Sequence, residues 1–438
     1  MPLNTKRLQL LHFFAWIVLG LLACQPNKHN AFEDTLPIEP FVLSGITIDN
    51  LQQKLQSGEL TSREVTQLYI DRIKMYDKKG PALHAVIKIN PDALELALRM
   101  DAERKENKIR GPLHGIPVLI KDNIDTHDQM PTTAGSLAMA DNWPEKDAFI
   151  VQKLREAGAI ILGKTNLSEW ANFRSTHSIS GWSSVGGQTK NPYVLDLSPC
   201  GSSSGSAVAV AADFCMVAVG TETDGSIACP SSLNGVVGIK PTVGLVSRSG
   251  VIPISRSQDT PGPIARTVSD AAILLSAMAG YDPNDETTLR CVATGVTDYT
   301  QYLKTDGLKG KRIGVEKTMR HQNDPVGQLL EEALATLVSQ GATLVDVVFA
   351  DAYELISEQE FEILETEFKA GINEYLAASN TGIHSLEELV AFNTEHDSTV
   401  MPLFKQEIMI DALTKGGLDS KPYLDALSAT YQLRTHLD

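Results

Sequence analysis

Short apolar runs and longer amphipathic segments alternate along most of the chain. Four apolar runs have the length of buried strands, and they read HAVIKI, GIPVLI, AIIL and CMVAVG. In the segments VTQLYIDRIKMY, DALELALRMDAE and SDAAILLSAMAG, apolar residues recur at the spacing of one helix face. This alternation is typical of an α/β fold. Because no low-complexity linker divides the chain, we expect one large domain.

Polar residues mark the starts of these predicted helices. Thr61 and Glu64 have the spacing of a capping box, an Asn-Pro pair at 90–91 opens the second helix, and Thr267 with Asp270 caps the third. Further along, KRIGVE and ATLVDVVF predict two more strands. From about residue 351 to the end, segments rich in Glu, Leu and Ala predict long helices that form a layer over the site.

The first 24 residues have the pattern of an export signal, because two basic residues precede an apolar run that ends in LLAC. This ending resembles the lipobox of bacterial lipoproteins, in which the cysteine, here Cys24, is lipidated after cleavage. A cleaved signal peptide and an uncleaved anchor stay open as alternatives. We therefore predict export to the periplasm, or to the outer membrane as a lipoprotein attached through Cys24. Residues 25–44 are interpreted as a linker, and residues 45–438 as the folded domain.

Composition excludes several classes of function. With 438 residues, of which 42% are hydrophobic, the chain can bury a large core. Its formal net charge of −16 argues against nucleic acid as a partner. The histidines form no HExxH motif and the cysteines no CxxC spacing, so we predict no metal and no organic cofactor. Apart from Cys24, we expect the cysteines to be buried thiols packed as small hydrophobes: Cys200, Cys215, Cys229 and Cys291.

Two short motifs match nucleotide and nucleophile signatures. GAIILGKT, residues 158–165, fits the P-loop expression, but its spacer is itself an apolar strand, so we reject nucleotide binding. GSSSG, residues 201–205, fits the nucleophile elbow with Ser203 in the middle. That motif should directly follow a strand, whereas a turn-like segment precedes it here. We interpret it as a chance match.

Lys121 ends the apolar run GIPVLIK, where a charged ammonium needs an anion, water or the loss of its proton. Asp122 and Asp125 are the nearest residues for an ordinary ion pair. The alternative is a catalytic amine. Half neutrality near pH 7.4 requires a pKa about 3 below the usual value, or roughly 4 kcal/mol, which burial can supply.

Two loops rich in small and hydroxyl residues follow later in the chain, CGSSSGSAVAVAA and TETDGSIACP. The first would place serines and backbone N–H groups at a helix start, where negative charge is favoured, and Gly225 in the second lets the backbone approach a ligand closely. Taken singly, each loop is more simply interpreted as a serine-rich turn. Together with IPVLIKDN and GVVGIKPTVGLVS, these loops have the order and spacing of the amidase signature family. The chain resembles that family over about residues 45 to 435. The resemblance implies a central mixed, twisted β-sheet covered by helices on both faces.

By position in these motifs, Lys121 matches the family's catalytic lysine, Ser202 the bridging serine after a cis peptide bond, and Ser226 the nucleophile. The resemblance implies hydrolysis of an amide to acid and ammonia through an acyl-enzyme, with no obligate protein partner. It also implies an oxyanion hole built from the backbone N–H groups of Thr223, Asp224, Gly225 and Ser226. Because family members usually continue further, we expect the domain to lack a C-terminal segment.

Departures from the family pattern narrow the predicted substrate. Many members read GTDTGGSIR, whereas this chain has Glu222, Asp224 and Ala228 in place of Asp, Gly and Arg. The missing arginine argues against small anionic amides and against the amidotransferase that deamidates glutamine. The segments TNLSEWANFRS and SISGWSSVGGQTKNPY resemble peptide amidases, which hydrolyse the C-terminal amide of peptides. An amidase for fatty-acid or aryl amides and a catalytically silent envelope binding protein are the alternatives. Asp224 either faces the substrate or holds its own loop.

Overall fold

A computed structural model describes residues 41–319, 324–349 and 357–437. Residues 45–438 group as one unit, and the turn at residues 41–44 belongs to the other unit. The predicted export signal with Cys24 and most of the predicted linker lie outside the described residues, so both stay predictions. Within the described ranges, no helix is long and apolar enough to cross a membrane.

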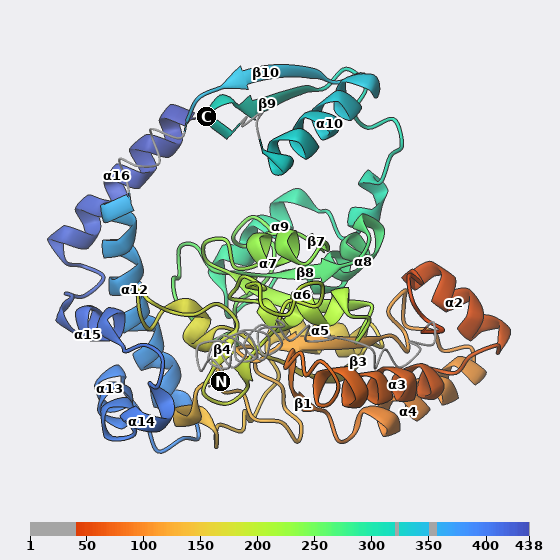
Figure 1. Ribbon diagram of the computed structural model, residues 1–438, viewed down its shortest axis with the longest axis horizontal. Helices are drawn as coiled ribbons and strands as arrows, with labels where there is room; N and C mark the ends of the chain where they lie inside the picture. The colour runs from red at the N-terminus through yellow and green to blue at the C-terminus, as the bar shows by residue number, and fades with distance from the viewer. Residues whose placement is uncertain (1–40, 320–323, 350–356, 438) are drawn as a thin grey trace, which may run out of the picture. The chain divides into compact units, whose positions relative to one another are not determined.

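A six-stranded mixed sheet forms the centre of the fold, with strand order β1-β3-β2-β6-β8-β7 (Figure 1). The three strands β3, β2 and β6 run parallel, while the pairs β1·β3, β6·β8 and β8·β7 are antiparallel. Two short pairs, β4·β5 and β9·β10, lie outside it. The strands are β1 (Val86–Ile89), β2 (Pro117–Lys121), β3 (Ile160–Thr165), β4 (Trp182–Ser183), β5 (Gly187–Gln188), β6 (Val217–Glu222), β7 (Val237–Gly238), β8 (Thr260–Ala265), β9 (Arg312–Glu316) and β10 (Thr343–Val347).

The apolar runs of the sequence become the interior strands of this sheet. Every residue of β2, β3, β6 and β8 is buried, which is why these runs lack the polar alternation of a half-exposed strand. Strand β8 was not predicted, because its sequence TPGPIA contains two prolines that argue against a central strand. Three of the four spacer residues of the P-loop match, Ile160 to Leu162, lie in β3, so the structure agrees with the rejection of that motif.

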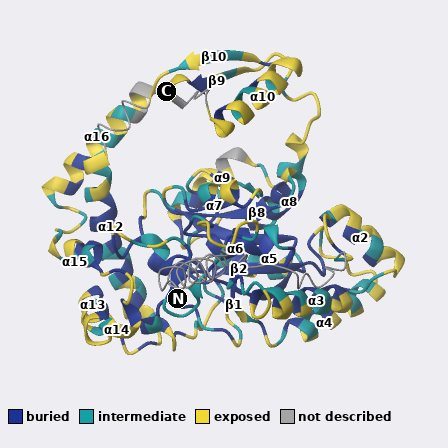
Figure 2. Ribbon diagram, viewed as in Figure 1, coloured by how far each residue is buried: buried dark blue, intermediate teal, exposed yellow. Residues whose placement is uncertain are grey.

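Helices pack on the sheet, and two of the three predicted caps form. The helix expected to open at residues 90–91 begins instead at Ala93, with Asp92 at its N-cap and no side-chain cap. Thr61 and Glu64 form both hydrogen bonds of a capping box at the start of α3, and Thr267 accepts from the Asp270 N–H at the start of α8. Helix α6 is buried against β2, β3, β6 and β8, and Figure 2 shows it as a dark core element. The helices are α2 (Ile48–Ser57), α3 (Ser62–Arg72), α4 (Ala93–Lys105), α5 (Phe149–Glu156), α6 (Ser204–Ala211), α7 (Ala228–Leu233), α8 (Val268–Met278), α9 (Leu289–Thr294), α10 (Pro325–Ser339), α12 (Ser357–Ala378), α13 (Leu386–Glu395), α14 (Asp397–Val400), α15 (Glu407–Thr414) and α16 (Lys421–Leu437).

The C-terminal helices form a second apolar cluster that reaches the site. Phe368 on α12 shares this cluster with Ile252 and Ile254 of the loop before β8. The carboxylate of Glu367, also on α12, accepts hydrogen bonds from the Ser255 hydroxyl at 2.5 Å and from the Ser257 N–H at 3.0 Å. The helices predicted for the end of the chain therefore hold a loop that lines the site.

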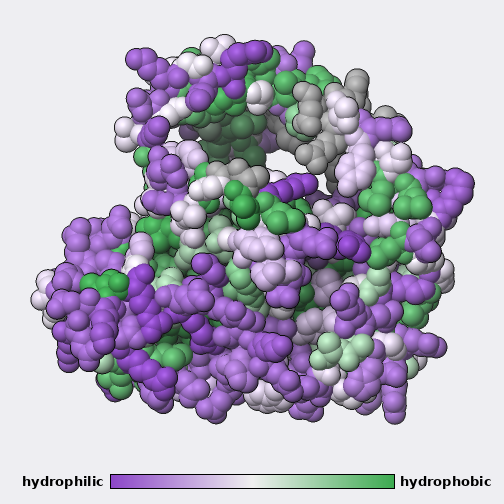
Figure 3. Space-filling view, turned by 180° about the vertical axis from the view of Figure 1, so that it is seen from behind, coloured by the Kyte–Doolittle hydropathy of each residue, from purple (hydrophilic) through white to green (hydrophobic). Residues whose placement is uncertain are grey.

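The surface is mostly hydrophilic when seen from behind, and apolar side chains gather over the part formed by β9, α10 and β10 (Figure 3). Val326, Leu329 and Val338 on α10 are among the exposed apolar residues there, as are Val348 and Phe349 after β10. The site described next lies on the central sheet, at the ends of β2 and β6.

Candidate active site

Lys121 is the last residue of β2 and is fully buried. Its Nζ donates hydrogen bonds to Ser202 Oγ at 2.8 Å, to Thr221 Oγ1 at 2.8 Å and to the Thr221 carbonyl oxygen at 3.2 Å. Because β2 and β6 are parallel neighbours, the carboxyl end of β2 brings the lysine beside the end of β6, where Thr221 lies. The side chain of Lys121 is thus hydrogen-bonded to hydroxyl and carbonyl oxygens of Ser202 and Thr221.

The two aspartates proposed as ordinary partners of Lys121 have other contacts. The Asp122 carboxylate accepts from the Thr133 hydroxyl, and it lies 3.8 Å from the ammonium of Lys164. Asp125 accepts a hydrogen bond of 2.8 Å from the Tyr375 hydroxyl. The interpretation of Lys121 as half of a simple ion pair with either residue is therefore wrong.

Burial controls the charge of Lys121. Desolvation lowers the pKa of its ammonium from 10.5 to about 7, against the opposing influence of the carboxylates of Asp259 and Glu222. Near neutral pH, a large fraction of the side chain is therefore an unprotonated amine. An amine with a free lone pair, 2.8 Å from a serine hydroxyl, can act as a general base.

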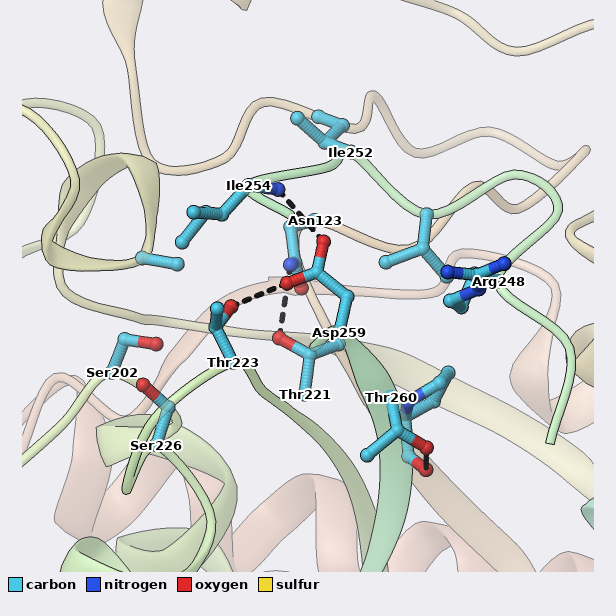
Figure 4. Close-up of a pocket in the computed structure, with 13 residues that line it drawn as sticks. Asn123, Ser202, Thr221, Thr223, Ser226, Arg248, Ile252, Ile254, Asp259 and Thr260 are labelled. Carbon is cyan, nitrogen blue, oxygen red and sulfur yellow. Dashed lines mark hydrogen bonds between the residues drawn. The ribbon is translucent and has the colours of Figure 1, made fainter. Parts of the chain in front are cut away.

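Ser202 and Ser226 line the same pocket. Ser202 follows Gly201 through a cis peptide bond, as the resemblance implied. The Ser203 N–H donates to the Ser226 carbonyl oxygen at 3.1 Å, which links the two loops directly. Figure 4 shows the two serine hydroxyls turned toward each other at the floor of the pocket, although no hydrogen bond joins them in the described structure. Lys121, Ser202 and Ser226 are thus brought together from three separate motifs.

The loop from Thr223 to Ser226 connects β6 to the start of α7. No hydrogen bond from its four backbone N–H groups to another described residue is present. Gly225 has φ +75°, a left-handed conformation that favours glycine, and the space where its Cβ would lie is open. Free N–H groups beside the Ser226 hydroxyl are the kind of donors that an oxyanion hole uses, so the arrangement is compatible with the predicted one.

Two carboxylates that sequence reasoning had not assigned to the site hold this loop. Glu222 is buried, and its Oε2 accepts from the N–H groups of Ile227 at 2.6 Å and Ala228 at 2.8 Å. On the other side, the Thr223 hydroxyl donates to Asp259. The Asp224 side chain is exposed and has no hydrogen bond to another described residue. The loop is therefore held by Glu222 and Thr223, and not by Asp224.

Asp259 also fixes the opposite wall of the pocket. Its second carboxylate oxygen accepts from the N–H groups of Ile254 at 2.8 Å and Ser255 at 2.9 Å. Burial raises the pKa of Asp259 to about 6, opposed by its hydrogen bonds. Asn123, whose Nδ2 donates to Thr221 Oγ1 at 3.0 Å, completes the surroundings of the lysine. No local sequence signal identified Asp259, because it follows a loop that only the sheet brings to the site.

Removing the carboxylate of Glu222 is expected to disorder the loop from Thr223 to Ser226. We expect Glu222→Ala to lower the free energy of unfolding by about 1–3 kcal/mol, because two N–H groups lose their acceptor. It should also lower kcat roughly tenfold or more, because Ser226 and the backbone N–H groups of this loop shift. Denaturant unfolding and ammonia release would measure the two effects. The exposed Glu95→Ala is the control, and an unchanged kcat in Glu222→Ala would contradict the assignment.

One expectation about the cysteines is wrong. Cys200 and Cys229 form a disulfide, with a Cα–Cα distance of 5.9 Å, and only Cys215 and Cys291 are buried free thiols among the described residues. The pair is separated by 29 residues without any spacing motif. It forms because α6 and β6, which lie between the two cysteines in the sequence, bring Cys229 back beside Cys200. In the part of the chain that the structure describes, no group of three or more metal-ligating side chains is present.

Fold and site together define a hydrolase of amide bonds. A family model described as Amidase matches residues 64–436, so the chain belongs to the amidase family. A probable amidase of Arabidopsis thaliana is 44% identical over 392 residues, which cover 87% of this chain and 74% of the plant protein. A glutamyl-tRNA(Gln) amidotransferase chain of Streptomyces coelicolor is 36% identical over 386 residues, which cover 86% of this chain and 75% of the bacterial one.

Solved structures agree with this membership. The native peptide amidase from Stenotrophomonas maltophilia shares 50% sequence identity at a TM-score of 0.87, covering 90% of this chain and 80% of that one. An amidase family protein from Bacillus anthracis shares 39% identity at a TM-score of 0.84, covering 89% and 76% of the two chains. The predicted α/β fold with a central mixed sheet covered by helices is confirmed.

Proposed function

We propose that this amidase hydrolyses the C-terminal amide of peptides, with Ser226 as nucleophile, Ser202 as proton relay and Lys121 as general base. The observation that carries the proposal is the buried Lys121, whose amine lies 2.8 Å from Ser202 Oγ at the pocket that Ser226 also lines. With its pKa lowered to about 7, this lysine can accept a proton at neutral pH. No histidine is needed.

The first half of the reaction forms an acyl-enzyme. Neutral Lys121 accepts the proton of Ser202 while Ser202 accepts that of Ser226, so that Ser226 Oγ attacks the amide carbonyl carbon. The oxygen of the tetrahedral intermediate becomes negative, and the free N–H groups of the loop from Thr223 to Ser226 stabilise it. One such donor is worth roughly 3 kcal/mol. The proton returns through Ser202 to the amide nitrogen, the C–N bond breaks, and ammonia leaves.

The second half releases the acid. A water molecule loses a proton to the same relay and attacks the ester carbonyl of the acylated Ser226. The tetrahedral intermediate again places its negative oxygen at the same loop. Its collapse breaks the bond to Ser226 Oγ, which recovers its proton, and the free carboxylic acid departs. Lys121 ends the cycle as the neutral amine, ready for another turnover.

Support for a peptide substrate comes from the pocket walls and from the relatives. A cavity of about 360 Å³ adjoins the pocket and shares Arg248, Val251 and Asp259 with it, which leaves room for substituents beyond the reacting amide. The guanidinium of Arg248 is paired with Asp285 at 2.6 Å, so this wall is no strong site for a carboxylate. The 50% identity to a peptide amidase agrees with this substrate class.

A substrate panel tests this proposal. We expect ammonia release from C-terminally amidated di- and tripeptides, with kcat/KM at least about tenfold above the values for benzamide-like amides, long-chain fatty amides and glutamine. The soluble chain without residues 1–24 would be assayed beside a preparation blocked at serine by a sulfonyl fluoride. A clear preference for aryl or fatty amides would reject the peptide substrate and keep the serine mechanism. Folded protein that binds peptide amides and releases no ammonia would favour the binding-protein alternative.

A further inference from the structure

A disulfide joins the two loops that carry the serines of the proposed mechanism. Cys200 precedes Ser202 by two residues in the relay loop, defined here as residues 198–203. Cys229 follows Ser226 by three residues and lies in the first turn of α7; residues 223–229, which include this turn, are called the nucleophile loop. We propose that this disulfide is a positioning clamp, which holds the nucleophile loop against the relay loop so that amide hydrolysis requires the oxidised pair. The inference rests on the proposed function of the two serines, whereas the clamp itself is a property of the loops.

Hydrogen bonds on either side of the disulfide connect the relay loop to the nucleophile loop and to the C-terminal end of α7. Nearer the site, the Ser203 N–H donates to the Ser226 carbonyl oxygen at 3.1 Å. Further out, the buried side-chain amide of Asn234 donates both to the Pro199 carbonyl oxygen at 2.8 Å and to that of Pro230 at 2.7 Å. Each proline is the chain neighbour of one of the two cysteines. The disulfide is thus the covalent member of a set of links that fix one loop relative to the other.

The two loops differ in how firmly the rest of the protein holds them. The relay loop packs tightly, because a Cβ on Gly201 would lie 2.2 Å from Ser168 Oγ, and the Ser168 N–H donates to the Ser202 carbonyl oxygen at 3.1 Å. The nucleophile loop has open space at Gly225, and its N–H groups from Thr223 to Ser226 have no acceptor among the described residues. The clamp therefore ties the nucleophile loop, which is otherwise held through Glu222 and Thr223, to a tightly packed neighbour.

Reduction can reach this disulfide. Cys200 and Cys229 are both partly exposed, in contrast to the buried thiols of Cys215 and Cys291. A dithiol such as dithiothreitol would transfer two electrons and two protons to the pair, which yields two thiols and the cyclic disulfide of the reagent. The clamp suits an oxidising compartment, where disulfides persist, and so agrees with the predicted export of the chain.

Two measurements on one set of proteins test the clamp: hydrogen–deuterium exchange of the loops, and steady-state ammonia release. The proteins are the oxidised wild type, the same protein in dithiothreitol, and the double variant Cys200→Ser, Cys229→Ser. Cys291→Ala is the matched control for loss of a thiol outside the clamp. All assays are run well below the lowest thermal midpoint in the set, so that an effect on global stability does not enter.

We expect reduction or removal of the Cys200–Cys229 disulfide to lower kcat by about tenfold or more, because a displacement of the reacting groups by about 1 Å slows the reaction. KM should stay within about threefold of the wild-type value. Exchange should accelerate at residues 198–203 and 223–229 and stay unchanged in the sheet. Reoxidation should restore the wild-type protein and not the double variant. The Cys291→Ala control should match the oxidised wild type in both measurements.

Unchanged exchange in both loops, or unchanged kcat despite complete reduction, would overturn the clamp. So would acceleration of exchange spread evenly over the sheet, which is the mark of general destabilisation. If oxidised protein releases no ammonia from any amide while the two loops still loosen on reduction, the proposed function fails and the link between the loops stands. The two failures are therefore distinguishable.

Discussion

Replacing Ser226 by alanine is expected to lower kcat/KM for amide hydrolysis by about 10⁴-fold or more, because the proposed mechanism loses the oxygen that forms the acyl-enzyme. The fold should be unaffected, since the Ser226 hydroxyl has no hydrogen bond to another described residue and lines the pocket. Its backbone carbonyl, which accepts from the Ser203 N–H, remains in the variant. Ammonia release and covalent labelling by a sulfonyl fluoride would both be measured.

Ser231→Ala is the matched control for this substitution. Ser231 is a buried serine on α7, and its hydroxyl lacks a hydrogen-bond partner in the described structure. Its removal should therefore change neither labelling nor kcat by more than about threefold. Retention of most activity in Ser226→Ala would reject Ser226 as nucleophile and return attention to Ser202 and to Ser203, the central serine of the GSSSG motif.

Replacing Lys121 by methionine should lower kcat by about 10³-fold or more, because the proposed relay loses its base while the buried position keeps a side chain of similar length. The exposed Lys88→Met on β1 is the control and should retain wild-type activity. In the wild type, kcat/KM should rise with pH and level off above an inflection near 7, where Lys121 loses its proton. A rate that is flat between about pH 5.5 and 8.5, or that survives in Lys121→Met, would contradict this role.

Lys121→Met should also stabilise the folded protein. A lower kcat in this variant could therefore not be explained by unfolding. Lowering the pKa of Lys121 from 10.5 to about 7 corresponds to a cost of at most roughly 5 kcal/mol. That cost is fully present below pH 7, where the folded state must bury the ammonium. It is recovered between pH 7 and 10.5, where the unfolded chain binds a proton that the folded chain does not. Denaturant unfolding of Lys121→Met should therefore show a gain over wild type at about pH 6 that shrinks by about pH 10.

The sequence by itself determined most of the central strands and helix starts, and it pointed to the residues of the proposed relay. Strands β2, β3 and β6 could be predicted from the sequence, because strands that are buried on both faces consist of continuous apolar runs. The starts of α3 and α8 could be predicted, because a helix cap is formed by residues only three positions apart in the sequence. Lys121 could be identified as a candidate because a charged ammonium at the end of a buried apolar strand is unstable without a partner or the loss of its proton. The serines Ser202 and Ser226 came from resemblance to a family whose motifs the chain carries in order.

Only the tertiary structure decided what surrounds those residues. The partner of Lys121 on β6, Thr221, comes from a strand 100 residues away, and Asp259 reaches the nucleophile loop from the opposite wall of the pocket. Strand β8 was missed because its prolines oppose the local preference for strand, which the pairing with β6 overrides. The Cys200–Cys229 disulfide was missed because its spacing carries no motif. These contacts join positions far apart in the chain, so their existence depends on how the sheet orders its strands, which no local pattern of residues specifies.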